Sequence, residues 1–318
     1  MATAFRAIPK PGLVPGFFLL ALFTACDEPP TAASDEGRPA RLSLAGELEN
    51  PDLREASGMT TSQRDPKLLW LHNDSGAKAR LYAIDHRGRH RGRLTLDDAK
   101  NRDWEDVTSF TLDGTPYLLV ADIGDNDARH EAVTLYVVEE PDLSDDNKQR
   151  ADIAWKIRFR YPDGPRDAES VAVDIANERV LVLSKRELPP ALYSVPLRPA
   201  DDEVIVATRL GEVTSLPPPS RQDREIAPKT KNWHWQPTSM DLARDGSAAV
   251  ILTYAAVYYF AFDGNDWHST VNQPALAFDI RHIRDSEAIG FSADATSLFL
   301  TVEKKHAPLF RIDMRPEE

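Results

Sequence analysis

The stretch that decides the fold is residues 103–141, which read DWEDVTSFTLDGTPYLLVADIGDNDARHEAVTLYVVEEP. An acidic opening is followed by three short apolar runs, at 107–112, 117–121 and 133–138. The dipeptide Asp113-Gly114 separates the first two runs, and Asp-Gly is strongly favoured in the two-residue turns of β-hairpins. The stretch therefore predicts three antiparallel strands joined by polar turns.

The same unit recurs along the chain. The five copies open at positions 55, 105, 169, 238 and 287, and fourth, outer strands are expected at 91–96, 153–161, 204–213 and 270–280. Repeats of this size built from short strands are typical of β-propeller blades. We expect an all-β domain, a five-bladed β-propeller with four-stranded antiparallel blades.

The length of the repeat keeps a second blade number open. The 318 residues minus the first 40 leave 278, about 56 per unit, whereas a common blade has roughly 40–50 residues. Six blades, one of them degenerate, are therefore the alternative. The fifth unit lacks an outer strand of its own, and residues 41–47 are expected to supply it, so that the ring closes without an exposed sheet edge.

The N-terminal segment has the pattern of a targeting sequence. Arg6 and Lys10 precede an apolar stretch at 12–25, too short for a stable membrane anchor. The stretch ends in Leu-Phe-Thr-Ala-Cys26, which resembles the lipobox of bacterial lipoproteins. We therefore expect a signal peptide at 1–25, lipidation of Cys26, a flexible tether at 26–41 and the propeller at 42–318. The alternative is an ordinary secretory signal followed by a free cysteine.

Charge narrows the classes of partner. The formal charge is −13 and becomes −15 when Arg6 and Lys10 leave with the signal peptide. Such an acidic chain is a poor candidate for binding nucleic acid and a better one for binding cations. We expect a monomer that faces the periplasm, is held on the inner or outer membrane only by its lipid anchor, and recognises a small molecule or an envelope component.

Propeller topology predicts which residues meet. Each inner strand begins, and each second strand ends, at the same mouth of the central channel because the two are antiparallel. The openings of the units and the loops after their second strands therefore converge there, and they contain these polar residues: Glu55, Glu105, Asp106, Asp167, Glu169, Asp285 and Glu287, with His72, Asn73, Asp74, Asp122, Asp125, Asn126, Lys185, Arg186, Glu303 and Lys304.

So many carboxylates at one mouth repel one another unless something compensates. A hard divalent cation is one compensator, since carboxylate, amide and backbone oxygens are its preferred ligands and Ca²⁺ tolerates irregular geometry. The ligands expected for it are Glu55, Glu105, Asp122, Asp125, Glu169 and Glu287. The alternatives are internal ion pairs with basic side chains such as Lys185 and Arg186, and a solvated acidic mouth.

Catalytic signals are sparse. His72 lies close to Asp74 in sequence and suggests a proton shuttle, with Lys185 and Arg186 available to neutralise phosphate. A loop histidine that only donates and accepts hydrogen bonds is the alternative. The sequence contains no serine-hydrolase elbow, zinc-protease motif or P-loop. A long loop at 215–236 carries Trp233-His-Trp235, whose aromatic rings suit either stacking on a flat ligand or anchoring of the loop.

Several motifs carry a family resemblance: Glu55-Ala-Ser-Gly58, Trp70-Leu-His-Asn-Asp-Ser-Gly76, Asp103-Trp-Glu-Asp106, Ala121-Asp-Ile-Gly-Asp-Asn126 and Asp167-Ala-Glu169. Together they resemble a group of uncharacterised bacterial secreted β-propellers, similar to the phytase-like and SdiA-regulated propellers. The resemblance implies a calcium-dependent phosphoester hydrolase, although the calcium ligands of true propeller phytases have no residue-by-residue match here. A metal-assisted phosphoester hydrolase is thus one expectation, and a non-catalytic ligand- or protein-binding module of the cell envelope is the other.

Overall fold

The fold is taken from a computed structural model, which describes residues 41–144, 146–201, 203–218 and 235–314. These residues form five β-sheets arranged as the blades of a five-bladed β-propeller. The expected fold class and blade number are confirmed, and the six-bladed alternative is wrong. The signal peptide, Cys26 and the tether up to residue 40 fall outside the described residues, as do Trp233 and His234, while Arg41, the last residue of the expected tether, already belongs to a strand.

The first two blades follow the order of the chain. Blade 1 contains β2 (Ala56–Thr61), β3 (Leu68–Asn73), β4 (Arg80–Asp85) and β5 (His90–Leu96), and blade 2 contains β6 (Trp104–Leu112), β7 (Thr115–Asp122), β8 (Val133–Glu139) and β10 (Trp155–Arg160). A fifth, parallel strand extends each of them: β9 (Lys148–Ala151) pairs with β5, and β14 (Val204–Val206) pairs with β10.

The remaining blades have four strands each. Blade 3 contains β11 (Ala168–Asp174), β12 (Arg179–Ser184), β13 (Ala191–Pro196) and β15 (Thr208–Glu212). Blade 4 contains β16 (Pro237–Leu242), β17 (Ala248–Thr253), β18 (Ala256–Ala261) and β19 (Leu276–Asp279). Blade 5 contains β20 (Ser286–Phe291), β21 (Ser297–Val302), β22 (Pro308–Asp313) and β1 (Arg41–Glu47). The expected strand at 204–213 is therefore two strands, which extend different blades.

Local sequence explains the hairpins. Asp113 and Gly114 both have positive φ, 50° and 80°, as the tight turn between β6 and β7 requires. In the described residues, helix is limited to the single turns η1 (Ile175–Asn177) and α2 (Trp267–Thr270). Within the described residues, no helix has the length and apolar character needed to cross a membrane.

Buried apolar side chains hold neighbouring blades together. One cluster joins blades 1, 4 and 5 through residues such as Met59, Leu252 and Leu300. Another joins blades 1 and 2 around Trp70 and Trp104, both of which are almost fully buried. Each blade is covered on both faces by its two neighbours. Its inner strands are therefore buried almost throughout, rather than on alternate residues.

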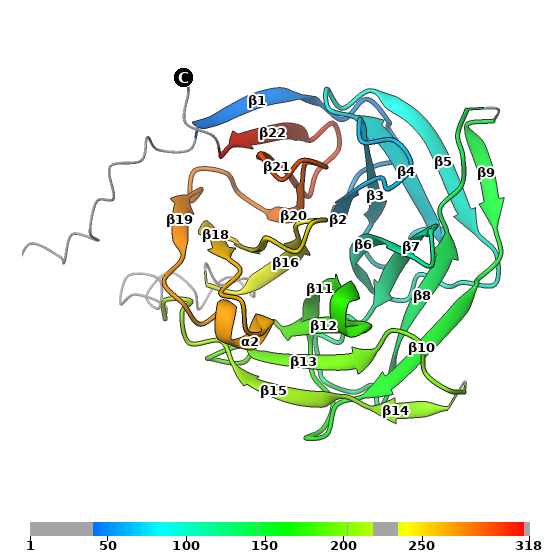
Figure 1. The fold of residues 1–318 in the computed structure, drawn as a ribbon. Helices are drawn as coiled ribbons and strands as arrows, with labels where there is room; N and C mark the ends of the chain where they lie inside the picture. Colours follow the sequence, from blue (N-terminus) through cyan, green and yellow to red (C-terminus); the bar gives the residue numbers. More distant parts are fainter. Residues whose placement is uncertain (1–40, 145, 202, 219–234, 315–318) are drawn as a thin grey trace, which may run out of the picture. The chain divides into compact units, whose positions relative to one another are not determined.

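The two ends of the described chain close the ring. Strand β1 pairs antiparallel with β22, with Arg41 opposite Asp313 and Glu47 opposite Pro308. Figure 1 shows the two strands side by side as the outermost layers of blade 5. The expected closure by residues 41–47 is confirmed, and blade 5 consists of the first strand and the last three.

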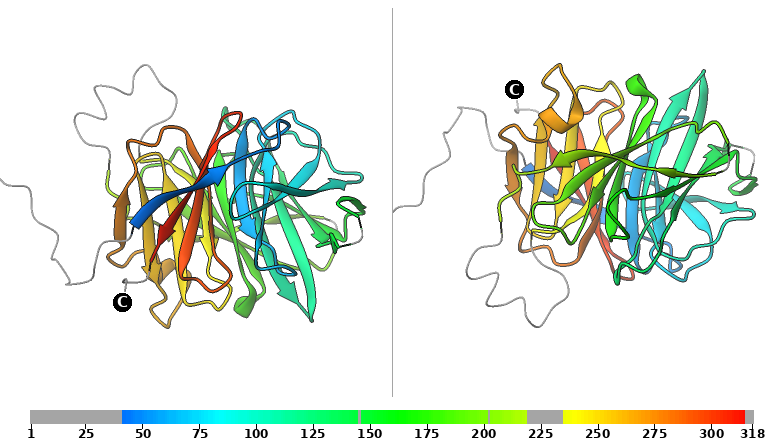
Figure 2. Two further views of the ribbon diagram at one scale, coloured as in Figure 1. Left: turned by 90° about the horizontal axis from the view of Figure 1, so that it is seen from above. Right: turned by 90° about the horizontal axis from the view of Figure 1, so that it is seen from below.

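The innermost strands of the five blades are β2, β6, β11, β16 and β20, which surround the centre of the ring in Figure 1. The edge-on views of Figure 2 show the strands running between the two faces of the ring. The beginnings of these inner strands define the mouth of the channel that carries the site below.

Candidate functional site

A β-bulge near the start of every inner strand selects the residue that faces the channel. In blade 2, Trp104 pairs with Asp122 and Asp106 with Ala121, so Glu105 is an extra residue without a partner opposite it. The same shift leaves Glu169, Thr238 and Glu287 as the extra residues of β11, β16 and β20. Bulges re-aim side chains and are frequent beside active sites.

Blade 1 has the same bulge with different chemistry. Ser57 and Gly58 together lie opposite His72, so a serine occupies the position that holds glutamate in three other blades. The Ser57 hydroxyl donates to the carbonyl of Glu105 (2.8 Å), and the Thr238 hydroxyl donates to the carbonyl of Ser286 (3.0 Å). Ser57 and Thr238 thus link adjacent inner strands. The glutamates at the equivalent positions of the other three blades have their carboxyl groups at the channel.

A second tier of side chains comes from the residue that follows each second strand. In blades 1, 3, 4 and 5 this residue is Asp74, Lys185, Tyr254 and Glu303. In blade 2 it is the buried Ile123, and Asn126 farther along the same loop takes its place. The two tiers enclose a cavity of about 130 Å³, lined by Ser57, Asp74, Glu105, Asn126, Glu169, Lys185, Tyr254, Glu287 and Glu303.

The lining of this cavity, called the acidic cavity below, carries five carboxyl groups and one ammonium group. Glu105, Glu169 and Glu287 are 5%, 5% and 7% exposed, so water screens them poorly. Burial and mutual repulsion both disfavour ionised carboxylates in such a place. The acidic cavity is therefore a site of high electrostatic cost unless positive charge enters it.

Lys185 supplies the positive charge that the described residues contribute to the lining. Its ammonium forms an ion pair with Glu169 and donates to the Tyr254 hydroxyl (3.1 Å), which in turn donates to Glu287 (2.6 Å). Although burial opposes the charge, attraction by Glu169, Glu287 and Glu105 raises the pKa of Lys185 above its usual range. One lysine and one tyrosine thus stabilise two of the five carboxyl groups.

The carboxyl groups respond to burial and to one another. Burial, with repulsion from neighbouring carboxylates, raises the pKa values of Glu105 and Glu169 well above the ordinary value. Burial also raises the pKa of Glu287 to about 7, and that of Asp103, beside the cavity, to about 6. Each of these groups therefore keeps its proton to a higher pH than an exposed carboxyl group does.

Two groups of carboxyl oxygens are close enough to share a cation. Oxygens of Asp74, Asp103 and Glu105 lie within 4.8 Å of one another, and so do oxygens of Glu105, Asp167 and Glu169. Glu105 belongs to both groups. The Oε2 atom of Glu169 is buried and accepts no hydrogen bond from the residues that the structure describes, although a buried carboxyl oxygen normally has a partner.

Glu55, expected at the mouth, lies elsewhere. Its side chain is exposed and does not line the acidic cavity. The bulge register places Ser57, two residues later, at the position of Glu105, while Glu55 corresponds to Asp103 in blade 2. The alignment of the first unit was displaced by two residues, whereas the alignment of the other four was correct.

His72 is fully buried, and both of its ring nitrogens are engaged. Its Nε2 accepts from the backbone N–H of Gly58 (3.1 Å), and its Nδ1 lies 2.9 Å from the carbonyl oxygen of Asn73. Burial lowers the pKa of the imidazole to about 4. His72 therefore packs behind the bulge of blade 1, and its expected neighbour Asp74 enters the cavity without it.

The remaining predicted residues shape the surrounding loops. Asp122 accepts from the backbone N–H of Asp103 (2.9 Å), and Asp125 accepts from those of Arg129 (2.9 Å) and His130 (2.7 Å). These carboxylates hold the blade 2 loop and do not line the cavity.

Arg186 lies next to the cavity rather than in its lining. Its Nε atom is 2.7 Å from Asp167 Oδ2, and its guanidinium also donates to Asn126, which does line the cavity. About 29% of the Arg186 side chain is exposed. Arg186 is thus a partly accessible, positively charged side chain close to the acidic cavity.

Sequence reasoning overlooked Tyr254, Ser57 and Asp103. Tyr254 follows its strand at the same offset as Lys185 and Glu303, so counting from the end of each second strand would have found it. Asp103 and Ser57 depend on the bulge register, which has no local sequence signal.

Comparison with known proteins adds no argument about the family or the function of this chain. No protein-family model matches the chain, and no curated protein matches its sequence. Among solved structures, it is similar to the crystal structure of Chaetomium thermophilum Raptor, with 12% sequence identity and a TM-score of 0.43. The match covers 88% of this chain and 30% of that one. A likeness at this level carries no argument about function.

Proposed function

We propose that the propeller binds a hard divalent cation in the acidic cavity, and that Ca²⁺ is the best match. The observation that supports this most is the convergence of five carboxyl groups on a small buried cavity whose lining supplies one lysine. The ligands we assign are Glu105 with Asp74 and Asp103, together with Glu169, which belongs to the second group of oxygens around Glu105.

Ion pairs within the protein neutralise only part of the negative charge at the acidic cavity. Lys185 is committed to Glu169, and Arg186 to Asp167. Within the described parts of the chain, no lysine or arginine forms an ion pair with Asp74, Glu105 or Glu303. A cation would compensate these carboxylates and would also give the Oε2 atom of Glu169 a partner.

Calcium fits this donor set better than magnesium does. The donors are carboxylate and amide oxygens that come from several different strands and loops. Ca²⁺ accepts six to eight oxygen ligands in irregular geometry, whereas Mg²⁺ demands a near-ideal octahedron.

A metal-assisted phosphoester hydrolase is the catalytic form of this proposal. A cation bound here would polarise a phosphoryl oxygen and lower the pKa of a bound water. Arg186, partly accessible beside Asn126, would then neutralise a phosphate at the rim. With His72 buried behind the bulge, Glu287, which is not among the assigned ligands and whose pKa burial raises to about 7, is the better candidate for moving a proton.

A non-catalytic binding module is the second form, and one observation favours it. The acidic cavity measures about 130 Å³, enough for an ion and a few waters but small beside the roughly 300–1,000 Å³ of common ligand pockets. In either form we place the protein on the periplasmic side of the cell envelope, anchored through Cys26.

Calcium titration of the soluble domain, residues 41–318, tests the proposal. After removal of metal with a chelator, calorimetry and thermal melting are followed as CaCl₂ is added, with MgCl₂ as the comparison. At one hundred times the dissociation constant, binding is expected to add about 2.7 kcal/mol to the free energy of unfolding. The absence of heat and of any shift in the melt would reject the cation site.

A phosphatase and phosphodiesterase panel separates the two forms. Turnover that needs Ca²⁺ and stops with chelator supports the hydrolase. Calcium binding without turnover of any panel substrate supports the binding module.

A further inference from the structure

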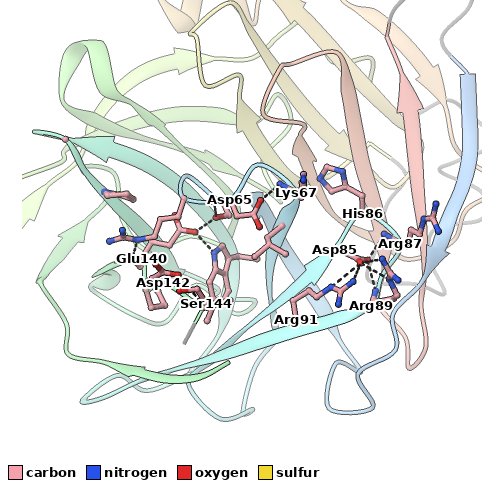
Figure 3. A pocket seen from close by; sticks show the side chains of 18 residues that line it. Asp65, Lys67, Asp85, His86, Arg87, Arg89, Arg91, Glu140, Asp142 and Ser144 are labelled. Atoms are coloured by element: carbon pink, nitrogen blue, oxygen red, sulfur yellow. Dashed lines mark hydrogen bonds and ion pairs between the residues drawn. The ribbon is translucent and has the colours of Figure 1, made fainter. Parts of the chain in front are cut away.

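A second, larger hollow lies at the other end of the inner strands. It measures about 920 Å³ and is formed by the loop between β2 and β3, the turn between β4 and β5, and the residues after β8. The acidic cavity adjoins the start of β2, whereas Ser62, which lines this hollow, follows its end. The two sites are therefore separated by the length of that strand. Figure 3 shows this hollow, called the basic groove below.

The sequence of the β4–β5 turn is unusual for so acidic a chain. Residues 86–93 read HRGRHRGR, with four arginines in eight residues, in a chain of net charge −13. The basic groove is lined by five cationic side chains, Arg64, Lys67, Arg87, Arg89 and Arg91, against four carboxylates, Asp65, Asp85, Glu140 and Asp142. Positive charge is thus concentrated where the rest of the chain is strongly negative.

Asp85 is used to hold the arginines in place. Its Oδ2 atom accepts from Arg89 Nε (2.7 Å) and from Arg91 Nη2 (2.5 Å), and its Oδ1 accepts from the backbone N–H of Arg87 (2.9 Å). Burial opposes ionisation, but the hydrogen bonds from these arginines lower the pKa of Asp85 to about 2. Figure 3 shows the three arginines gathered around this carboxylate.

The carboxylate of Glu140 is likewise held by hydrogen bonds from neighbouring residues. It accepts from Trp70 Nε1 (2.8 Å), from the backbone N–H of Gln63 (2.9 Å) and from the Ser62 hydroxyl, and its side chain is buried. This carboxylate fixes the β2–β3 loop against the end of β8, so it adds little negative potential at the surface of the groove.

The side chains of Lys67 and Arg87 are not held by a carboxylate in this way. Both side chains are exposed, and neither forms an ion pair with a carboxylate in the described parts of the chain. Beside Arg87, the Nε2 atom of His86 is buried and has no hydrogen-bond partner among the described residues. An ammonium and a guanidinium group without carboxylate partners in a preformed hollow indicate an anionic ligand.

We propose that the basic groove binds a phosphate-bearing ligand. Guanidinium groups present paired N–H donors that match two phosphate oxygens, and the Asp85 contacts pre-orient Arg89 and Arg91 for this. The volume suits a phosphorylated metabolite or a phospholipid headgroup, which share the phosphate that these donors recognise. This site is independent of the cation proposal because it shares no lining residue with the acidic cavity.

Binding assays in metal-free buffer test this proposal on the soluble domain. Pyrophosphate titration by calorimetry probes the free ligand, and co-sedimentation with vesicles of phosphatidylcholine containing phosphatidic acid probes the headgroup. The test variant is Lys67→Glu with Arg87→Glu, two exposed positions whose replacement leaves the Asp85 contacts intact. The charge-matched control is Lys304→Glu with Lys305→Glu, exposed residues of the β21–β22 loop.

The test variant is expected to weaken binding at least tenfold, with the control within twofold of the native protein. Binding of pyrophosphate alone identifies a soluble phosphate ligand, and binding of vesicles alone identifies a headgroup. The proposal is overturned if neither probe binds the native protein, if the test variant binds normally, or if both variants lose affinity equally. Thermal melts confirm that each variant is folded.

Discussion

The carboxylate of Asp106 accepts a hydrogen bond from the backbone N–H of Met240 at 3.3 Å, joining the inner strand of blade 2 to that of blade 4. It also accepts from the backbone N–H of Val171 in blade 3 (3.0 Å) and from the hydroxyl of Ser239 (3.2 Å). Asp106 is completely buried and directly follows Glu105. The channel is therefore bridged immediately behind the acidic cavity.

Asp106→Ala is expected to lower the free energy of unfolding by about 2–4 kcal/mol, because it leaves several buried donors without an acceptor. Asp106→Asn, which keeps one accepting oxygen, is the matched control and is expected to lose less. Urea denaturation measures both. Equal stability of the alanine variant and the native domain would show that the bridge is unimportant.

Glu105→Gln is expected to weaken Ca²⁺ binding by about 100-fold or more, because Glu105 belongs to both groups of clustered carboxyl oxygens. Glu55→Gln makes the same change in an exposed residue outside the cavity and is expected to alter affinity by less than threefold. Calorimetric titration measures both. Equal losses would mean that overall charge, rather than a defined site, governs binding.

Gly124→Ala tests the packing behind Glu105. A Cβ atom at this position would lie 2.1 Å from Glu105 Oε1 and 2.5 Å from Asp103 Oδ2, so both carboxylates must move. We expect at least a tenfold loss of Ca²⁺ affinity with the fold retained in the metal-free state. Calorimetry with a parallel thermal melt checks this, and an unchanged affinity would place the cation elsewhere.

Lys185→Met removes the ammonium from the cavity and leaves Glu169 without its ion-pair partner. Breaking a buried pair costs about 3–5 kcal/mol, so the metal-free domain is expected to lose stability of that order at pH 7. The double variant Lys185→Met with Glu169→Gln is expected to recover part of the loss. Urea denaturation measures the series, and an unaffected single variant would show that the pair contributes nothing.

The metal-free domain is expected to become less stable as pH rises from about 4.5 to about 7. Burial raises the pKa of Glu287 to about 7 from an ordinary 4.5. The folded state therefore keeps a proton that the unfolded state has lost, which makes stability fall with pH in this window. We expect a change of roughly 1–3 kcal/mol.

Glu287→Gln is expected to flatten this dependence. Denaturation curves at several pH values, in chelator, provide the measurement. A native profile that rises through the same window, or a variant with the native slope, would contradict the role assigned to Glu287.

The apolar runs allowed the blades to be predicted because strands buried on both faces must be apolar almost throughout. The Asp113-Gly114 turn and the closing strand at 41–47 followed from the same reasoning, since a hairpin needs positive φ and a ring needs its last edge covered. Both are confirmed.

The candidate site was only partly predictable. Glu105, Glu169 and Glu287 meet as expected, but the bulge decides which residue of each opening faces the channel, and so Ser57 enters where Glu55 was expected. A bulge is a pairing irregularity between two strands, so it has no signature within one of them. For the same reason the burial of His72 behind that bulge was invisible in the sequence.

The pairing of β1 with β22 also sets an order of events during synthesis. Chains fold from the N-terminus as they leave the ribosome, yet β1 has no strand to pair with until β22 emerges some 260 residues later. Until then its edge is an open template for aggregation, with Leu44 still 68% exposed in the finished fold. The edge of β1 therefore stays open to pairing with other chains until β22 has been synthesised.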